Sequence, residues 1–345
     1  MHKNPSYKLT ALYISIIAVV VLVMTVLIFE KYNALEVLST IRNIDYIFVF
    51  VGISMIFLQL YSEAFCFKIL FSLLGKKISV FSASGYAGTD LLYSNISPAQ
   101  IAGLPAAGYT MFKDGISPSL SCSVLPLYSM CNRIAVVVVA LASVVVFPIL
   151  LSTGSALFSV LLIYGAILNL ALVSVFAVVI FAPDFAGRII PYLLKKASKF
   201  KVLHLTDEKI CSACCGVEKY ISAAKVMRKS PFTVLLVIAI CVFKRIVNFA
   251  IVYWTYLAFG LRDESFSYVI ALQSVLAVSS ELVPVPGAAG VTENVFTILY
   301  SGVFGPRLYI AAMIVSRFLN FFVLLAVSGS YALIYKFWGK RGKDT

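Results

Sequence analysis

Long apolar stretches alternate with short polar connections along the chain, and this pattern predicts its fold. Six stretches are each long enough, at about 20 residues or more, for an α-helix to cross the hydrocarbon core of a bilayer. They cover residues 11–29, 44–74, 119–151, 156–182, 231–260 and 307–338. Only 12% of the residues are charged and 61% are hydrophobic, which is too little polar surface for a soluble globule. We therefore predict an all-α polytopic membrane protein with six full spans in one integral membrane domain, residues 1–345.

Two further apolar regions are interrupted by proline, glycine and polar residues. Residues 95–105 read NISPAQIAGLP, and residues 281–293 read ELVPVPGAAGVTE. Proline lacks a backbone N–H, and glycine adopts backbone conformations that helices do not use. Non-helical backbone at membrane depth persists where protein or water satisfies its polar groups, so such breaks usually line a cavity. We predict two re-entrant or broken helical segments, shaped by Pro98, Gly103, Pro105, Pro284, Pro286, Gly287 and Gly290.

Charge predicts the orientation of the spans. The net charge is +13, and residues 183–230 hold ten Lys or Arg against four acids. Basic loops beside spans remain on the cytoplasmic side, so we place this loop and both termini in the cytoplasm, in the inner (cytoplasmic) membrane. The first broken segment then begins and ends inside, and the second begins and ends outside. Basic loops of this kind contact anionic lipid, and we expect no nucleic-acid partner.

The two halves of the chain repeat one order of elements. Residues 44–151 and 231–338 each hold a long span, a broken segment, and a second long span with an embedded arginine, Arg133 or Arg317. The interval from Gly103 to Arg133 is 30 residues, and that from Gly290 to Arg317 is 27. We predict inverted repeats, the architecture in which transporters bind substrate near the midplane.

Charged residues within the spans are the candidate binding residues. A cation at the centre of a span costs about 2.5 to 3.5 kcal/mol on insertion scales, so nearby carboxylates, including Glu63 and Asp90, should compensate. An intramembrane ionisable residue is functional by default, and arginine binds phosphate through two parallel hydrogen bonds. The alternatives are an ion-pair network that only fastens helices, or snorkelling to the interface. The predicted substrate-binding residues are Arg133, Arg317, Lys244, Arg245, Glu281 and Glu293.

Signatures of enzymes and cofactors are missing from the sequence. The two histidines, His2 and His204, lie outside the predicted spans, and no G-x-S-x-G, H-E-x-x-H or P-loop pattern occurs. We predict a transporter that is not an enzyme and that has no catalytic residues, cofactor or metal. Cys211, Cys214 and Cys215 in the basic loop leave zinc binding, reduced structural thiols and palmitoylation open.

The broken segments resemble the two signatures of the lysylphosphatidylglycerol synthase transmembrane, or flippase-like, family. Residues 96–105 and 108–116 are similar to the first, a T/S-P-x-x-x-G-G-x-P core before a Tyr-rich stretch and a Lys-Asp-Gly turn. Residues 284–293 are similar to the second, P-x-P-G-G-x-G-x-x-E. The resemblance covers residues 44–335. The sequence departs from these signatures at Ala102, Ala288 and Thr292, which stand where members often have Gly, Gly and Arg.

The resemblance implies the role of the membrane half of these proteins, without the soluble aminoacyl-transferase domain. We expect a flippase-like transporter that moves a polar, anionic, phosphate-bearing lipid between leaflets, with an anionic or modified phospholipid as its partner. Two other interpretations are a secondary transporter of a small anion and an accessory membrane subunit of a lipid- or glycosyl-transferase system. A cytoplasmic lipid-modifying enzyme and a second copy of the chain, as a homodimer, are further partner candidates.

Overall fold

The computed structural model describes residues 39–151, 156–182, 185, 230–285 and 287–338. All regular elements within these ranges are helices. The predicted span over residues 11–29, nearly all of the basic loop with its three cysteines, and Pro286 lie outside the described residues.

Five helical stretches in the described part are long and apolar enough to cross a membrane. Four of them match predicted spans and are α3 (Tyr46–Leu73), α6 (Pro118–Val146), α7 (Ala156–Phe181) and α10 (Pro231–Ala258). The fifth runs from Val291 to Trp338. A short 3₁₀ turn, η1 (Pro148–Leu151), follows α6. The prediction of an all-α polytopic membrane protein is confirmed.

The surface and the interior reverse the pattern of a soluble protein. Large apolar side chains point outward, with Phe50 70% exposed and Phe232 77% exposed. Charged side chains such as Glu63, Arg133 and Lys244 are buried inside. An apolar exterior around a polar interior suits a bilayer, because lipid tails solvate the outer face while the charges need protein or water partners.

The first broken segment consists of α4 (Val80–Ile96), residues 97–102, and α5 (Gly103–Lys113). The Ser97 hydroxyl accepts a hydrogen bond of 3.1 Å from the Ala102 N–H, which helps to close the non-helical turn. Pro98 lies in this turn. Gly103 and Pro105 lie in the first turn of α5, where the missing proline N–H has no helical partner to lose.

The second broken segment consists of α11 (Phe266–Ser280), residues 281–290, and the first part of α12 (Val291–Arg317). The helix α12 bends at Gly305, the residue before Pro306. The backbone of Gly305 is not helical, with φ 74° and ψ 167°. The predicted last span therefore begins just after this bend. It continues through a π-helical turn, η2 (Phe318–Val323), into α13 (Leu324–Trp338).

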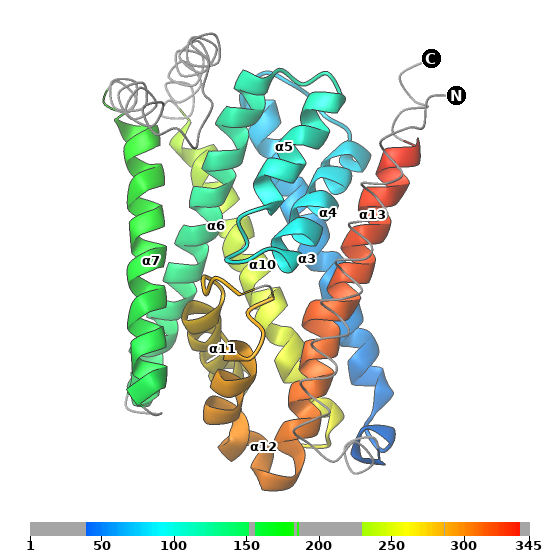
Figure 1. Cartoon of the computed structure of the whole chain (residues 1–345), viewed down its shortest axis with the longest axis vertical. Coiled ribbons are helices and arrows are strands. Elements are labelled where there is room, and N and C mark those ends of the chain that lie inside the picture. Colours follow the sequence, from blue (N-terminus) through cyan, green and yellow to red (C-terminus); the bar gives the residue numbers. More distant parts are fainter. Residues whose placement is uncertain (1–38, 152–155, 183–184, 186–229, 286, 339–345) are drawn as a thin grey trace, which may run out of the picture.

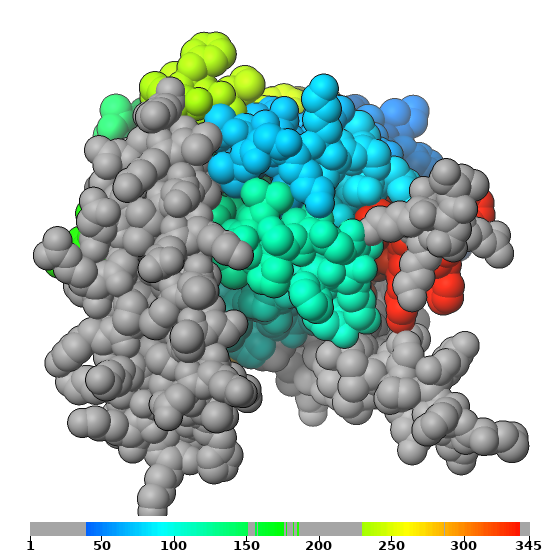
Figure 2. Space-filling model, turned by 90° about the horizontal axis from the view of Figure 1, so that it is seen from above, coloured from blue at the N-terminus to red at the C-terminus, as the bar shows by residue number. Residues whose placement is uncertain are grey.

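The broken segments enter from opposite ends of the bundle. Figure 1 shows α4 and α5 at one end and α11 with the bend of α12 at the other, so that both interruptions come near the middle. Seen from above in Figure 2, the residues of α5 occupy the middle of the first end, beside those of the α3–α4 region. The helices α3 and α10 pack along each other, and α13 packs against α4. The non-helical turns are thereby enclosed by long helices.

Candidate functional site: a polar cavity between the broken segments

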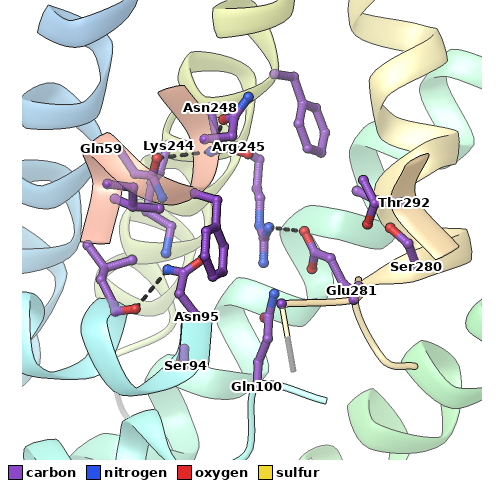
Figure 3. Close-up of a pocket in the computed structure, with 18 of the residues that line it drawn as sticks. Gln59, Ser94, Asn95, Gln100, Lys244, Arg245, Asn248, Ser280, Glu281 and Thr292 are labelled. Carbon is purple, nitrogen blue, oxygen red and sulfur yellow. Dashed lines mark hydrogen bonds and ion pairs between the residues drawn. The ribbon is translucent and has the colours of Figure 1, made fainter. Parts of the chain in front are cut away.

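A cavity of about 180 Å³ lies where the two interruptions meet. Its wall takes residues from α3, α4, α6, α10, α11, α12 and η2, together with residues of both non-helical turns. The charged members are Glu63, Asp90, Lys244, Arg245, Glu281 and Arg317. Neutral polar members include Gln59, Ser94, Asn95, Gln100, Tyr128, Asn132, Asn248, Gln273, Ser280, Thr292 and Asn320. Figure 3 shows Gln100, Arg245 and Glu281 converging on this space from three different elements.

Arg245 and Glu281 form the central ion pair. Arg245 Nη1 lies 2.6 Å from Glu281 Oε1, and Figure 3 shows the guanidinium directed at this carboxylate. Arg133 Nη1 lies 3.6 Å from Glu281 Oε2. Arg133 is not among the residues that line the cavity, whereas its neighbour Asn132 is. Arg133 therefore contacts Glu281, which lines the cavity.

Lys244 faces a different partner from the residue that follows it. Its Nζ donates to Glu63 Oε2 at 2.9 Å and to the Tyr128 hydroxyl at 2.6 Å. Consecutive residues of a helix point about 100° apart, so Lys244 joins α10 to α3 while Arg245 reaches the second broken segment. Two of the carboxylates that the sequence offers as compensation, Glu63 and Glu281, are thus paired with these cations.

Arg317 anchors the second non-helical turn. Its Nε donates to Glu293 Oε1 at 2.6 Å, and its Nη2 donates to the Gly287 carbonyl at 2.9 Å. Glu293 therefore forms an ion pair with Arg317 in which both side chains are mostly shielded from solvent. Glu293 and Arg317 also line a smaller neighbouring cavity of about 50 Å³.

Several buried polar atoms at the site lack a hydrogen-bond partner among the described residues. The unpaired donors are Arg133 Nη1 and Arg245 Nε, and the unpaired acceptors are Glu63 Oε1, Glu281 Oε2 and Glu293 Oε2. An unsatisfied buried group costs about 1 to 3 kcal/mol, and more when it is charged. A ligand or water in the cavity that supplies partners for the lining atoms Glu63 Oε1, Arg245 Nε and Glu281 Oε2 would recover part of this free energy.

Neutral amides form a network that was not predicted from the sequence. Asn248 donates to Gln59 Oε1 at 3.0 Å and to Asn320 Oδ1 at 3.3 Å, which links α10 to α3 and η2. The sequence did contain a signal for this network, because Gln59 lies four residues before Glu63 and Asn248 lies four residues after Lys244. Residues four apart share a helix face, so each pair marks a polar stripe on an otherwise apolar helix.

The structure brings most of the predicted binding residues together. Lys244, Arg245, Glu281 and Arg317 are in the cavity wall, Glu293 is in the adjoining cavity, and Arg133 contacts Glu281. Of the residues predicted to shape the breaks, Gly287 lines the cavity. Among the described residues, no group of three or more His, Cys, Asp or Glu could hold a metal ion. The binding role of these residues stays a prediction.

At two positions the chain has alanine where the family signatures have glycine, and the backbone conformation differs between them. Ala102 has φ −86° and ψ −14°, which suits any residue. Ala288 has φ +50°, in the left-handed region that favours glycine. The substitution by alanine is therefore harmless at the first position and strained at the second.

Comparison with known proteins places the sequence in context. Residues 11–328 match the family described as the lysylphosphatidylglycerol synthase TM region. No curated protein matches the chain significantly.

Proposed function

The chain belongs to the lysylphosphatidylglycerol synthase TM region family, and we propose that it acts as a flippase-like transporter. In this proposal it moves a polar, anionic, phosphate-bearing lipid between the two leaflets of the cell membrane. It does so without chemical change to the lipid, and both chain termini face the cytoplasm.

One observation carries the proposal: Arg245 lines the polar cavity and holds a buried Nε with no hydrogen-bond acceptor among the described residues. Its Nη1 is committed to Glu281, so the guanidinium is held in place while Nε remains available. A phosphate has several strong acceptor oxygens and suits the planar donor geometry of arginine. Arg317, also in the wall, adds positive charge to the same space.

The size of the cavity favours a head group over a whole lipid. Sites that enclose a drug-sized ligand have volumes of about 300 to 1,000 Å³, and this cavity has about 180 Å³. A phosphate with a small polar substituent fits such a space. The acyl chains would then remain against the apolar outer faces of the helices.

The arrangement of helices supports movement between two faces. We propose that residues 44–151 and 231–338 are inverted repeats with re-entrant segments, because α3 and α10 each have 28 residues while α4 and α11 have 17 and 15. Both α4 and α11 begin at a serine that caps the first turn, Ser79 and Ser265. Their positions at opposite ends in Figure 1 suit alternating access to a central site.

The test is transfer of lipid between leaflets in liposomes that contain the purified protein. We expect faster transfer of a labelled anionic phospholipid than in protein-free liposomes, and a decrease of about tenfold or more for Arg245→Gln, because a hydrogen bond to a charged group contributes about 1.5 to 3 kcal/mol. Arg307→Gln is the matched control, since Arg307 is exposed and lies outside the cavity.

Two results would overturn the proposal. One is the failure of both native lipid extract and defined anionic lipids to move faster with protein. The other is an Arg245→Gln variant that transfers lipid as the wild type does. Uptake of free phosphate without lipid transfer would instead favour a small-anion transporter. A stably copurifying lipid-modifying enzyme, with no transfer by the chain alone, would favour an accessory subunit.

A further inference from the structure

One of the four carboxylates near the centre of the bundle differs from the others. Asp90 on α4 is 6% exposed and lines the cavity, yet it has no salt bridge with any cation of the described residues. The other three each have a cation close by, in the pairs Glu63–Lys244 at 2.9 Å, Glu281–Arg245 at 2.6 Å and Glu293–Arg317 at 2.6 Å. An ionised carboxylate that is buried without a cation is strongly disfavoured, and such groups bind a proton instead.

Glu63 supplies the acceptor for that proton. Asp90 and Glu63 line the same cavity, and Glu63 Oε1 is buried there with no hydrogen-bond partner among the described residues. Glu63 Oε2 is held by Lys244, while Asp90 Oδ1 accepts from the Ser94 hydroxyl at 3.2 Å. Two ionised carboxylates are both acceptors only. A single proton between them would form the missing hydrogen bond and remove the repulsion.

We infer that Asp90 and Glu63 form a proton-binding site, in which protonated Asp90 donates to Glu63 Oε1. Glu63 Oε2 accepts from Lys244, whereas Asp90 forms no salt bridge among the described residues, and this difference places the proton on Asp90. The other titratable or charged groups that face this pair are Tyr128 and Arg133 of α6, with Cys66 of α3 and Cys241 of α10. Lys244, from α10, is the cation that pairs directly with a member of this site.

The site contacts the first broken segment directly. A Cβ atom added to Gly103 would lie 2.2 Å from Asp90 Oδ1 and 2.0 Å from Ser94 Oγ, so the start of α5 rests on these groups. Among the residues that the structure describes, no side chain caps the N-terminus of α5, and the end of a helix that presents free N–H groups favours a neighbouring anion. An ionised Asp90 therefore holds α5 more firmly than a protonated one. Proton binding and the position of α5 are thermodynamically linked.

This linkage rests on the proposed function and extends it. The energy for moving the lipid between leaflets comes from a proton gradient. A proton that enters from the outer side binds Asp90 and weakens its contact with α5. Release of the proton on the inner side restores this contact. No oxidant or further reactant is involved, because the proton moves onto and off the Asp90 carboxyl group.

The first experiment detects the proton without transport. Infrared spectra of the purified full chain should contain the carbonyl stretch of a protonated carboxylic acid that shifts in D₂O. We expect this band to be absent in Asp90→Asn and unchanged in Asp263→Asn, whose carboxylate is exposed in the loop after α10. The asparagine amide can still donate to Glu63, so the variant is expected to fold, as judged by its melting temperature. A wild-type spectrum without such a band, or a band that survives in Asp90→Asn, would overturn the inference.

The second experiment measures coupling in liposomes with the membrane potential clamped at zero. If one proton accompanies each lipid, a pH difference of about one unit displaces the ratio of lipid between leaflets about tenfold at equilibrium. Asp90→Asn should show no such displacement, whereas Asp263→Asn should respond as the wild type does. An unchanged response in Asp90→Asn would contradict the coupling. Absence of lipid transfer by the wild type, with the infrared band present, would instead contradict the proposed function and leave the proton site standing.

Discussion

Arg245 Nη1 lies 2.6 Å from Glu281 Oε1, which joins the middle of α10 to the first residue after α11. The second oxygen of the same carboxylate is 3.6 Å from Arg133 Nη1 on α6. Glu281 thus connects three elements at the edge of the cavity, and it balances two buried cations.

The sharing of Glu281 predicts an unequal effect of two substitutions. Glu281→Gln leaves Arg133 and Arg245 buried without a counter-ion and should destabilise the protein by about 3 to 5 kcal/mol. Arg133→Gln leaves the closer pair with Arg245 intact and should cost less. Thermal unfolding in detergent micelles measures both, with Asp263→Asn as the exposed control. Equal losses for the two variants would argue against a shared carboxylate.

Arg317 should not tolerate replacement by lysine. The guanidinium donates simultaneously from Nε to Glu293 and from Nη2 to the Gly287 carbonyl, and an ammonium group lacks this planar geometry. Arg317→Lys should lose about 1 to 3 kcal/mol of stability and lower the initial rate of lipid transfer. Arg307→Lys is the control at an exposed site. If Arg317→Lys retains the wild-type melting temperature and rate, the double contact is unimportant.

The left-handed backbone conformation of Ala288 predicts that replacing this residue by glycine stabilises the protein. Its φ of +50° costs an L-residue about 1 to 2 kcal/mol, part of which is offset by the entropy that glycine loses on folding. Ala288→Gly should raise stability by about 0.5 to 1 kcal/mol. Gly290 has φ +78°, and a Cβ atom added to it would have no neighbour within 4 Å among the described residues, so Gly290→Ala should shift the melting temperature in the opposite direction. A decrease for Ala288→Gly would contradict this account.

The close surroundings of Gly103 predict that adding a single methyl group there lowers the stability of the protein. An alanine here would place its Cβ against Ser94 and Asp90, and overpacking of this kind costs about 1 to 3 kcal/mol. A Cβ atom added to Gly302 in α12 would meet no atom of the described part of the chain within 4 Å, so Gly302→Ala should leave stability unchanged or slightly raised. The comparison of the two melting temperatures checks the close approach of α5 to α4. Equal values would refute it.

Much of the fold follows from local patterns. The apolar runs predict four of the long helices, because a span must satisfy its backbone polar groups internally and must be about 20 residues long. The clusters of proline and glycine predict the two interruptions for the same reason. The last predicted span begins at residue 307, just after the bend at Gly305, where glycine allows the positive φ.

The pairing of buried charges was harder to predict from the sequence than the helices were. Arg133 and Arg317 occupy matching places after the two interruptions, which suggests equivalent partners. In the structure both contact carboxylates of the second broken segment, Glu281 and Glu293. Residues 97–102 of the first turn contain no carboxylate. The matching sequence positions therefore do not produce matching contacts.

The sequence by itself determined that the chain is helical and embedded in a membrane, where its helices are interrupted, and which buried charges need partners. These properties depend on hydrophobicity, on the missing N–H of proline and on the cost of desolvating a charge, all of which are local. Only the tertiary structure decided that Asn132 lines the cavity while Arg133 contacts Glu281, and that Asp90 shares the cavity with Glu63 but has no salt bridge among the described residues. Such choices depend on the rotation of each helix and on neighbours distant in sequence, because consecutive residues of a helix point about 100° apart.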